Sequence, residues 1–248
     1  MEKQLPYTSF SKVYDATMKK VPYAIWADYI YNNFKTLGVG SHDRILEIAC
    51  GTGKLFSILN KMFLNLTGLD LSFEMLQRAR EKKIESLINA DMMSMPYADQ
   101  CFSAIYATHD SLNYLTNIGN IKKHFAEARR VLKKGGYYIF DLSTEYNVLK
   151  YYHEKTIKED HNGIEFLWHN FYDVSKNEII STLEFFNKRK NERNSSFLEI
   201  HRQKIFYDSE IINAAEESKF ALQKRSADYS ETKSLKKAQL MVYHFRKE

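Results

Sequence analysis

The chain has 248 residues, a length that suits one large domain or one domain carrying a sizeable insertion. Apolar residues make up 44% of the sequence and charged residues 27%, which excludes an intrinsically disordered or collagen-like chain. The 36 basic and 31 acidic side chains leave a net charge of +5. This small excess argues against a nucleic-acid partner without excluding one.

The sequence also indicates a compartment. No apolar run approaches the ~18 residues that a membrane helix needs. The cysteines, Cys50 and Cys101, are too few for a disulfide framework. The segment that begins at Met1 lacks an apolar signal region, and Glu2 stands where myristoylation requires glycine. We therefore expect a cytoplasmic protein without a membrane partner.

The first 150 residues alternate short apolar runs with helical patterns. In chain order they predict a strand at 44–48, a helix at 54–62, a strand at 64–69, a helix at 72–82 with Ser72 as its N-cap, strands at 85–89 and 102–106, a helix at 118–132, a turn at 133–136 and a strand at 137–140. Strands that alternate with helices predict right-handed crossovers. We expect an α/β fold with a doubly wound, mostly parallel sheet and helices on both faces.

The stretch after residue 150 has a different pattern. Three long extended runs, 164–172, 179–186 and 197–206, are rich in aromatic and β-branched residues, and Asn162-Gly163 is a strong hairpin signal. We therefore expect an antiparallel sheet, residues 151–207, inserted into a domain formed by residues 1–150 and 208–248. A helix at 208–219 and a strand pair at 221–229 and 238–245 close that domain. The basic run at 188–193 is interpreted as a solvated hairpin tip.

A glycine-rich turn, residues 47–53, ends the first predicted strand and opens a helix, where backbone can approach a ligand closely. A phosphate-binding loop does not fit, because Ile48 stands at its first glycine and Leu55 replaces its Ser/Thr. A dinucleotide fingerprint fits poorly, because Phe56 occupies its third glycine position. A third ligand, S-adenosylmethionine, is cationic at its sulfonium and ammonium groups, and the acidic Glu47 suits it.

Two further acids end the next predicted strands. Asp70 could accept hydrogen bonds from both ribose hydroxyls. Asp91 could bind the adenine amino group, with Met92 against the ring. Each acid alone could simply cap a turn, but three at successive strand ends around one glycine turn favour S-adenosylmethionine.

At this point the sequence resembles the class I S-adenosylmethionine-dependent methyltransferases over nearly its whole length. More narrowly it is similar to a bacterial subgroup of small-molecule methyltransferases, through Tyr14-Asp15, Val21-Pro22-Tyr23, Trp26 and the run 110–115. The resemblance implies a seven-stranded sheet whose last strand is antiparallel, and an N-terminal helical cover at 1–37. The sequence departs from the family at Ala49, where glycine is usual.

The positions of individual residues, together with the resemblance, indicate their roles. Cofactor-binding residues would be Tyr14, Glu47, Ala49, Gly51, Gly53, Asp70, Leu71, Asp91, Met92 and His109. Candidate general bases are His109, Tyr114 and His201, although either histidine could instead be satisfied structurally. Substrate-binding residues would be Asn113, Tyr114, Trp168, His201 and Arg202. No His/Cys/Asp/Glu cluster has metal-ligand spacing, so no metal is expected.

We therefore expect S-adenosylmethionine-dependent methyl transfer to nitrogen or oxygen of a small molecule. This in-line displacement needs no protein nucleophile, only alignment and exclusion of water. The inserted sheet would form a lid that carries acceptor specificity, or alternatively a homodimer interface. The competing functions are an RNA methyltransferase and a non-catalytic protein that binds S-adenosylmethionine.

Overall fold

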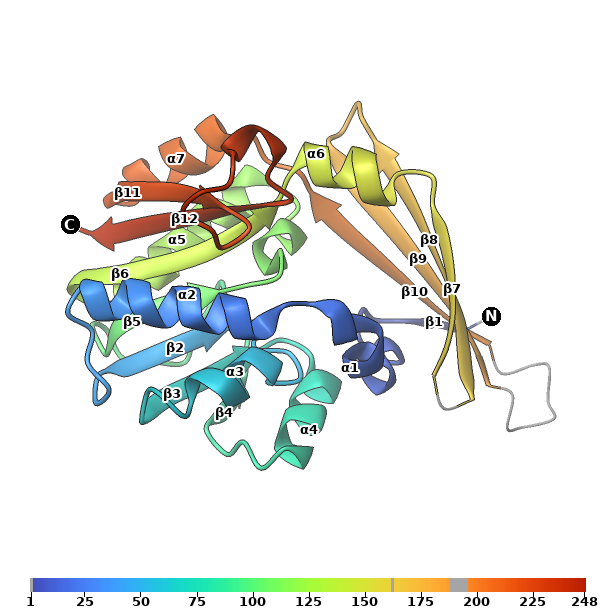
Figure 1. Cartoon of the computed structure of the whole chain (residues 1–248), viewed down its shortest axis with the longest axis horizontal. Coiled ribbons are helices and arrows are strands. Elements are labelled where there is room, and N and C mark those ends of the chain that lie inside the picture. The colour runs from blue at the N-terminus through green and yellow to red at the C-terminus, as the bar shows by residue number, and fades with distance from the viewer. Residues whose placement is uncertain (1, 162, 188–195) are drawn as a thin grey trace.

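The structure is a computed structural model that describes residues 2–161, 163–187 and 196–248. It contains two β-sheets, with a short N-terminal segment between them (Figure 1). Asn162 of the predicted hairpin and the basic run 188–193 lie outside the described residues.

The larger sheet has seven strands in the order β11-β12-β6-β5-β2-β3-β4. Its strands are β2 (Arg44–Ile48), β3 (Asn65–Asp70), β4 (Leu87–Asn89), β5 (Phe102–Ala107), β6 (Leu132–Ser143), β11 (Phe220–Ala227) and β12 (Leu240–Lys247). Neighbours from β4 to β6 pair in parallel, whereas β12 is antiparallel to both β6 and β11. The predicted fold class is therefore confirmed.

Helices cover both faces of this sheet. One face carries α2 (Tyr23–Thr36), α3 (Lys54–Leu59) and α4 (Phe73–Glu81), and the other carries α5 (Ile118–Val131) and α7 (Asp208–Glu217). Strand residues alternate between the faces: buried Ile45 packs with the first group, and buried Leu46 and Ile48 pack with the second. Ser72 caps α4 as predicted, since its hydroxyl accepts a hydrogen bond from the Met75 amide.

Strand β6 differs from the prediction. Residues 133–136 were expected to form a turn, but β6 already begins at Leu132 and pairs with β5 through a register shift between Phe102 and Ala104. Gly135 has a φ of +73°, so a glycine-dependent irregularity takes the place of the turn. After β6, the chain passes through α6 (Glu145–Asn147) and η4 (Val148–Tyr152) to the second sheet; η5 (Leu235–Lys237) precedes β12.

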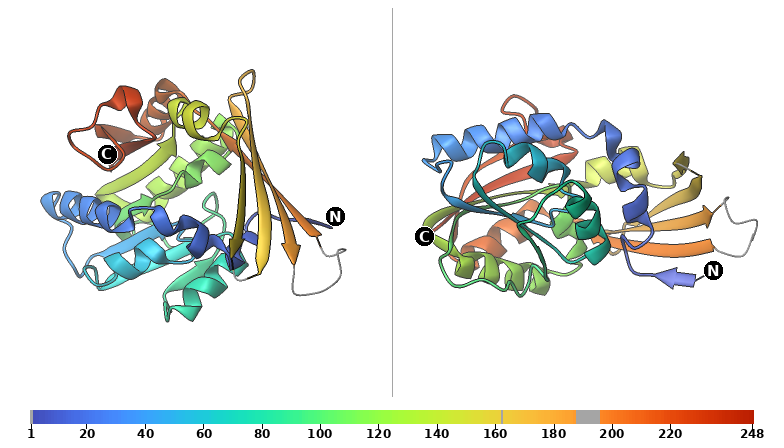
Figure 2. Two further views of the ribbon diagram at one scale, coloured as in Figure 1. Left: turned by 45° about the vertical axis from the view of Figure 1, so that its right-hand side comes forward. Right: turned by 90° about the horizontal axis from the view of Figure 1, so that it is seen from below.

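The second sheet has the strand order β1-β10-β9-β8-β7 (Figure 2). Its antiparallel strands are β7 (Thr156–His161), β8 (Ile164–Asp173), β9 (Glu178–Asn187) and β10 (Ser196–Lys204), as the sequence predicts. Strand β1 (Glu2–Gln4) adds in parallel to β10 and was not predicted, because three polar residues carry no strand pattern. The sheet is therefore an insertion completed by the N-terminus.

The N-terminal segment, residues 5–20, lies against one face of this second sheet. It contains three short helices, η1 (Phe10–Lys12), α1 (Tyr14–Thr17) and η2 (Met18–Lys20), which precede α2 in the predicted helical cover. Phe10 and Val13 are buried against Phe166 and Leu183. Trp168 packs on the same cluster as Phe166, as expected for residues two apart on one face of a strand.

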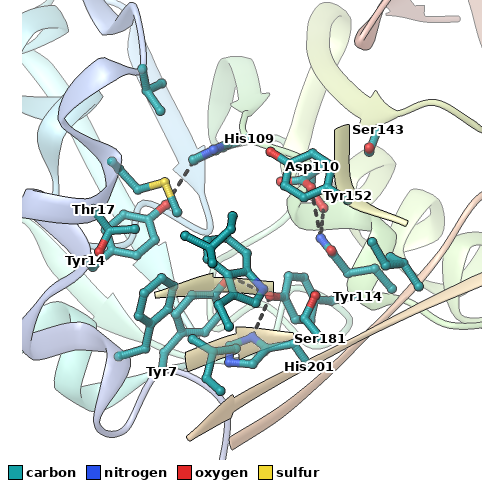
Figure 3. A pocket seen from close by; sticks show the side chains of 18 of the residues that line it. Tyr7, Tyr14, Thr17, His109, Asp110, Tyr114, Ser143, Tyr152, Ser181 and His201 are labelled. Atoms are coloured by element: carbon teal, nitrogen blue, oxygen red, sulfur yellow. Dashed lines mark hydrogen bonds between the residues drawn. The ribbon is translucent and has the colours of Figure 1, made fainter. Parts of the chain in front are cut away.

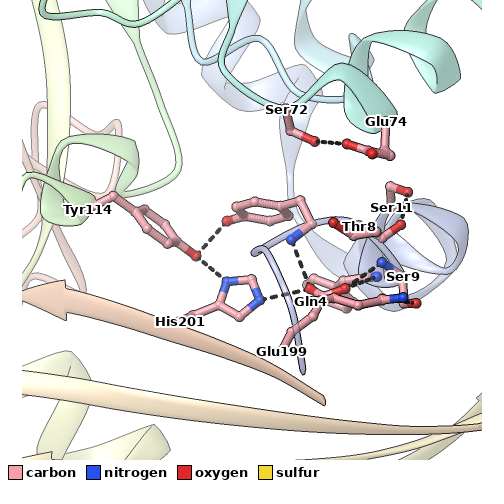
Figure 4. A network of polar contacts seen from close by, with 11 residues as sticks. Gln4, Thr8, Ser9, Ser11, Ser72, Glu74, Tyr114, Glu199 and His201 are labelled. Carbon is pink, nitrogen blue, oxygen red and sulfur yellow. Dashed lines mark hydrogen bonds and ion pairs between the residues drawn. The ribbon is translucent and has the colours of Figure 1, made fainter. Parts of the chain in front are cut away.

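A buried carboxylate fixes this segment to the sheet (Figure 4). Glu199 of β10 is fully buried and accepts hydrogen bonds from the backbone amides of Tyr7 (2.8 Å), Ser9 and Phe10 (2.9 Å). His201 Nε2 lies 3.1 Å from the same carboxylate. Charge-assisted bonds of this kind contribute about 1.5–3 kcal/mol each. Glu199 therefore holds the N-terminal segment in place.

We predict that Glu199→Gln lowers the free energy of unfolding by about 3 kcal/mol or more, because one amide oxygen cannot replace a carboxylate that accepts three N–H groups. Hydrogen exchange at the amides of residues 7, 9 and 10 should accelerate selectively. Urea unfolding and exchange mass spectrometry measure both effects.

The matched control is Glu217→Gln, which removes an exposed ion pair with Lys122 and should change stability by about 0–1 kcal/mol. Unchanged exchange at residues 7–10 in Glu199→Gln would show that the carboxylate does not hold the segment.

Candidate active site

The glycine-rich turn leaves β2 with unusual backbone geometry. Ala49, Gly51 and Gly53 have φ values of 54°, 56° and 73°, all in the left-handed region. A Cβ at Gly53 would lie 2.3 Å from Ile84 Cδ1, so only glycine fits there. Ala49 adopts this conformation with a side chain, at a cost that the usual glycine would avoid.

Asp70, at the end of β3, is tied to this turn. Its carboxylate accepts the Gly51 amide at 2.7 Å and the Ser72 amide at 2.8 Å. Burial raises the pKa of Asp70 to about 6, although these amide hydrogen bonds favour the ionised form. Leu71 beside it is 70% exposed at the same sheet edge. The carboxylate is thus held in a fixed orientation, with Leu71 free to contact a ligand.

Glu47 lies beneath the turn as a buried acid. It accepts a hydrogen bond from Tyr106 Oη at 2.7 Å and is 2% exposed. Burial, with a smaller effect of the Asp70 charge, raises its pKa to about 8. Glu47 and Gly51 line a small cavity of about 30 Å³ together with Tyr14 and His109. A buried carboxyl group with so high a pKa is well suited to a cationic ligand, which would stabilise its ionised form.

Asp91 and Met92 follow β4, the next strand along the sheet. Asp91 Oδ1 accepts the Met93 amide at 2.8 Å, and the Met92 carbonyl contacts His124 Nδ1 at 3.1 Å. Neither residue lines the cavity of the glycine turn. Their predicted role at the adenine end of the cofactor stays a prediction.

The backbone after β5 is strained. His109 and Asp110 have successive φ values of 61° and 51°. The Asp141 carboxylate of β6 accepts the amides of both residues, and Tyr229 Oη donates to it as well. Burial raises the pKa of Asp141 to about 6. Two adjacent non-glycine residues in this region each cost about 1–3 kcal/mol, and Asp141 holds them there.

A larger cavity of about 270 Å³ lies between this turn, the N-terminal segment and the second sheet (Figure 3). Tyr14 and His109 line both this cavity and the smaller one, so they form the wall between the two. Tyr14 Oη lies 2.9 Å from His109 Nδ1. Burial lowers the pKa of His109 to about 4, so its ring is neutral near pH 7.

A chain of hydrogen bonds crosses the larger cavity. Tyr114, at the end of η3 (Ser111–Tyr114), has its hydroxyl 2.7 Å from Tyr7 Oη and 2.8 Å from His201 Nδ1. His201 in turn reaches Glu199 (Figure 4). The structure therefore brings two predicted residues, Tyr114 and His201, into direct contact, and Tyr7 and Glu199, which the sequence reasoning missed, extend the chain at its two ends.

Of the other predicted acceptor-binding residues, one lines the larger cavity and two do not. Trp168 lines the larger cavity, with its Nε1 buried and without a partner in the described chain. Asn113 is wholly buried and bridges the Lys204 carbonyl (2.6 Å) and the Ser143 amide (2.9 Å), so both amide atoms are engaged away from the cavity. Arg202 lies on the outer face of β10, bonded to Glu178 at 2.9 Å. We therefore withdraw Asn113 and Arg202 as acceptor-binding residues.

Sequence reasoning missed Tyr7, Asp110, Glu199 and Gln203, which line or support the larger cavity. For Glu199 a signal existed, because it stands two residues before His201 and therefore shares its face of the strand. For Tyr7 there was none, since its position depends on the docking of the N-terminal segment.

Asp15 fixes the other end of the N-terminal segment to the glycine turn. Its carboxylate accepts Thr52 Oγ1 at 2.6 Å and pairs with Lys82 Nζ at 2.6 Å. Its carbonyl accepts Lys54 Nζ at 3.0 Å. The Tyr14-Asp15 motif thus places Tyr14 over the turn.

Within residues 2–161, 163–187 and 196–248, no three His, Cys, Asp or Glu side chains are grouped as metal ligands would be. None of the helices there combines the length and the apolar character that a membrane crossing requires.

Comparison with known proteins now adds independent findings. Residues 46–140 match the family described as a methyltransferase domain. The YqeM protein of Bacillus subtilis, whose name places it provisionally among methyltransferases, is 29% identical over 97% of both chains. A crystal structure of an S-adenosylmethionine-dependent methyltransferase from Clostridium acetobutylicum superposes with a TM-score of 0.82, at 25% identity, over 97% of this chain and 98% of the other. The chain is a class I S-adenosylmethionine-dependent methyltransferase.

The structure of the sugar N-methyltransferase KedS8 from Streptoalloteichus shares the fold of this methyltransferase, with a TM-score of 0.75 at 16% identity over 94% of this chain and 91% of the other. The cofactor is S-adenosylmethionine, which supplies the methyl group. The residues present fit it chemically. Glu47 would offer a buried carboxylate to its cationic end, Asp70 would offer an oriented carboxylate to its hydroxyls, and Gly51 and Gly53 would allow the backbone to approach it.

We predict that Asp70→Ala weakens S-adenosylmethionine binding by at least about tenfold, because two charge-assisted hydrogen bonds to hydroxyls together exceed ~1.4 kcal/mol. Calorimetry measures the affinity. Asp99→Ala, which alters an exposed acid paired with Arg130, serves as the control and should bind normally. If Asp70→Ala binds S-adenosylmethionine with normal affinity, then Asp70 does not bind the ribose.

The raised pKa of Glu47 predicts a pH-dependent stability. A carboxyl group whose pKa rises from 4.5 to about 8 on folding contributes fully below the lower value and loses that contribution as pH rises through the upper one. Ligand-free Glu47→Gln should therefore gain stability relative to the wild type between about pH 5 and about pH 9. Urea unfolding across this range measures the difference; a constant difference would mean that Glu47 is ionised in the free protein.

Proposed function

We propose that this methyltransferase transfers the methyl group to a nitrogen or oxygen atom of a small molecule bound in the larger cavity. The observation that carries the proposal is the shared wall. Tyr14 and His109 line both cavities, so an acceptor in one cavity meets the cofactor site directly. The second sheet and η4 line the acceptor side and shield part of it from solvent, which favours methyl transfer.

The lining of the cavity favours a small molecule over RNA. Its side chains are aromatic, apolar and neutral polar, with Asp110 and Glu159 as acids. Within the part of the chain that the structure describes, no lysine or arginine lines it. An RNA phosphate would find no cationic partner there, whereas an enclosed pocket with a few polar groups suits a small ligand. KedS8, which shares the fold, is named as a sugar N-methyltransferase, and a sugar is a small molecule of the kind proposed here.

We assign different roles to the candidate bases. His109 has a pKa near 4 and contacts Tyr14, so it positions that ring rather than accepting protons. His201 reaches the cavity through Tyr114 and has the Glu199 carboxylate on its other nitrogen. This carboxylate can stabilise an imidazolium, so His201 can receive a proton through the Tyr114 hydroxyl.

The direct test measures S-adenosylhomocysteine release with a library of small amines and alcohols, and separately with total bacterial RNA. We expect turnover with members of the library and background release with RNA. RNA turnover together with an inactive library would contradict the proposal.

We predict that His201→Ala reduces acceptor turnover by about 10²–10⁴-fold, the range for loss of general acid–base assistance. Its affinity for S-adenosylmethionine should stay within about twofold, because His201 does not line the cofactor cavity. Steady-state kinetics and calorimetry separate the two effects.

Arg202→Ala is the control, because this neighbouring side chain points to the outer face of the strand. It should leave both quantities unchanged. Loss of cofactor affinity in His201→Ala would refute the acceptor-side role. The alternative that this sheet forms a homodimer interface stays a prediction; its outer face exposes Phe171.

A further inference from the structure

The two acids in the larger cavity differ in their partners. Glu159 has its carboxylate 2.6 Å from His161 Nε2, so a histidine ring is its hydrogen-bond partner. The carboxylate of Asp110 receives only the neutral Gln203 amide, at 3.0 Å. Within residues 2–161, 163–187 and 196–248, no lysine, arginine or histidine forms an ion pair with it. Asp110 is thus an acid in a cavity wall without a cationic counterpart.

Several contacts hold Asp110 in this position. Asp110 follows His109 in the left-handed region, and Asp141 binds both amides of this turn. Gln203 Nε2 also contacts the Asp110 carbonyl at 3.3 Å. The Asp141 carboxylate therefore lies against the Asp110 backbone, and its negative charge acts on Asp110, which is unfavourable without a compensating cation. Burial, and next the Asp141 charge, raises the pKa of Asp110 to about 8.

The rings around this carboxylate add a second preference for positive charge. Tyr7, Phe10, Tyr14, Tyr152 and Trp168 line the same cavity. Figure 3 shows Asp110, Tyr152 and Tyr114 around one space. The face of an aromatic ring attracts a cation, and the attraction is stronger when water is excluded. A cavity with an unbalanced acid and aromatic walls recognises a cation rather than an anion.

We infer that the acceptor is an amine that enters as its ammonium form and is bound by the carboxylate of Asp110, with the aromatic rings around it. This inference rests on the proposed function, because it names the acceptor class of the same cavity. An alcohol or phenol acceptor would leave the acid unpaired, whereas an ammonium satisfies both its charge and its hydrogen-bonding capacity.

The same contact prepares the amine for reaction. An ammonium has no lone pair, so one proton must leave before nitrogen can attack. With the amine held at Asp110, the proton passes to His201 through the Tyr114 hydroxyl. The neutral amine then forms the new N–C bond while the S–C bond of the sulfonium breaks with its electron pair left on sulfur. The methylated product departs as an ammonium ion, and His201 returns its proton to solvent, so charge and protons balance.

The test compares benzylamine with benzyl alcohol, a matched pair of similar size of which only the amine is cationic near pH 7.5. Saturation-transfer NMR measures both dissociation constants on the full chain saturated with S-adenosylhomocysteine. We expect the wild type to prefer benzylamine by at least tenfold and Asp110→Asn to lose this preference. Glu159→Gln, which removes the carboxylate that contacts His161, should retain the preference for benzylamine within twofold.

Unchanged S-adenosylhomocysteine affinity in Asp110→Asn verifies that this variant is folded; Asp110→Glu, which keeps the charge, should retain part of the preference. The inference would be overturned if the wild type bound the two probes equally or bound neither. It would also be overturned if Asp110→Asn kept the full preference for benzylamine. If only alcohols are methylated in the turnover assay, the inference is wrong and the proposed function stands. If only RNA is methylated, the proposed function itself is wrong.

Discussion

The docking of the N-terminal segment by Glu199 is the interaction on which the site depends. A carboxylate buried in a β-sheet is costly unless hydrogen-bond donors surround it, and here three backbone amides and a histidine do so. At its other end the segment is held by Asp15 on the glycine turn. Because both ends are fixed, Tyr7 and Tyr14 form walls of the larger cavity rather than parts of a mobile arm.

The chemistry of the site follows from acids gathered at one edge of a parallel sheet. Glu47, Asp70 and Asp141 each lie at or near a strand end, and burial raises the pKa of each one. Such a concentration of carboxyl groups is unfavourable in the ligand-free protein and is relieved by cations. A sulfonium cofactor brings positive charge to this edge. The same electrostatics that destabilise the free site therefore select its ligands.

The sequence predicted the elements that depend on local pattern. Alternating strands and helices identified the doubly wound sheet, and the glycine turn with Glu47 and Asp70 identified the cofactor, which the family comparison confirms. These features could be predicted because the spacing of their residues along the chain determines how they are arranged in space. The short strand β1 and the broken helices of the N-terminal segment were not predictable, since they are stabilised by contacts nearly two hundred residues away.

The acceptor side illustrates the same limit. Neighbouring residues on β10 received the same predicted role, yet His201 faces the cavity and Arg202 faces outward, because strand residues alternate and the sequence did not say which face would be covered. Asn113 sits in a motif typical of the subgroup, but its amide is consumed in joining β6 to β10. Whether a polar residue binds substrate or backbone depends on tertiary contacts.

The central claim is that cofactor and acceptor meet across the wall formed by Tyr14 and His109. A crystal structure of the complex with S-adenosylhomocysteine tests it most directly. The account predicts the ribose hydroxyls on Asp70, the amino acid end near Glu47, and the sulfur atom facing the larger cavity beside Tyr14. A sulfur atom directed away from that cavity, or a ribose bound elsewhere than at Asp70, would contradict it.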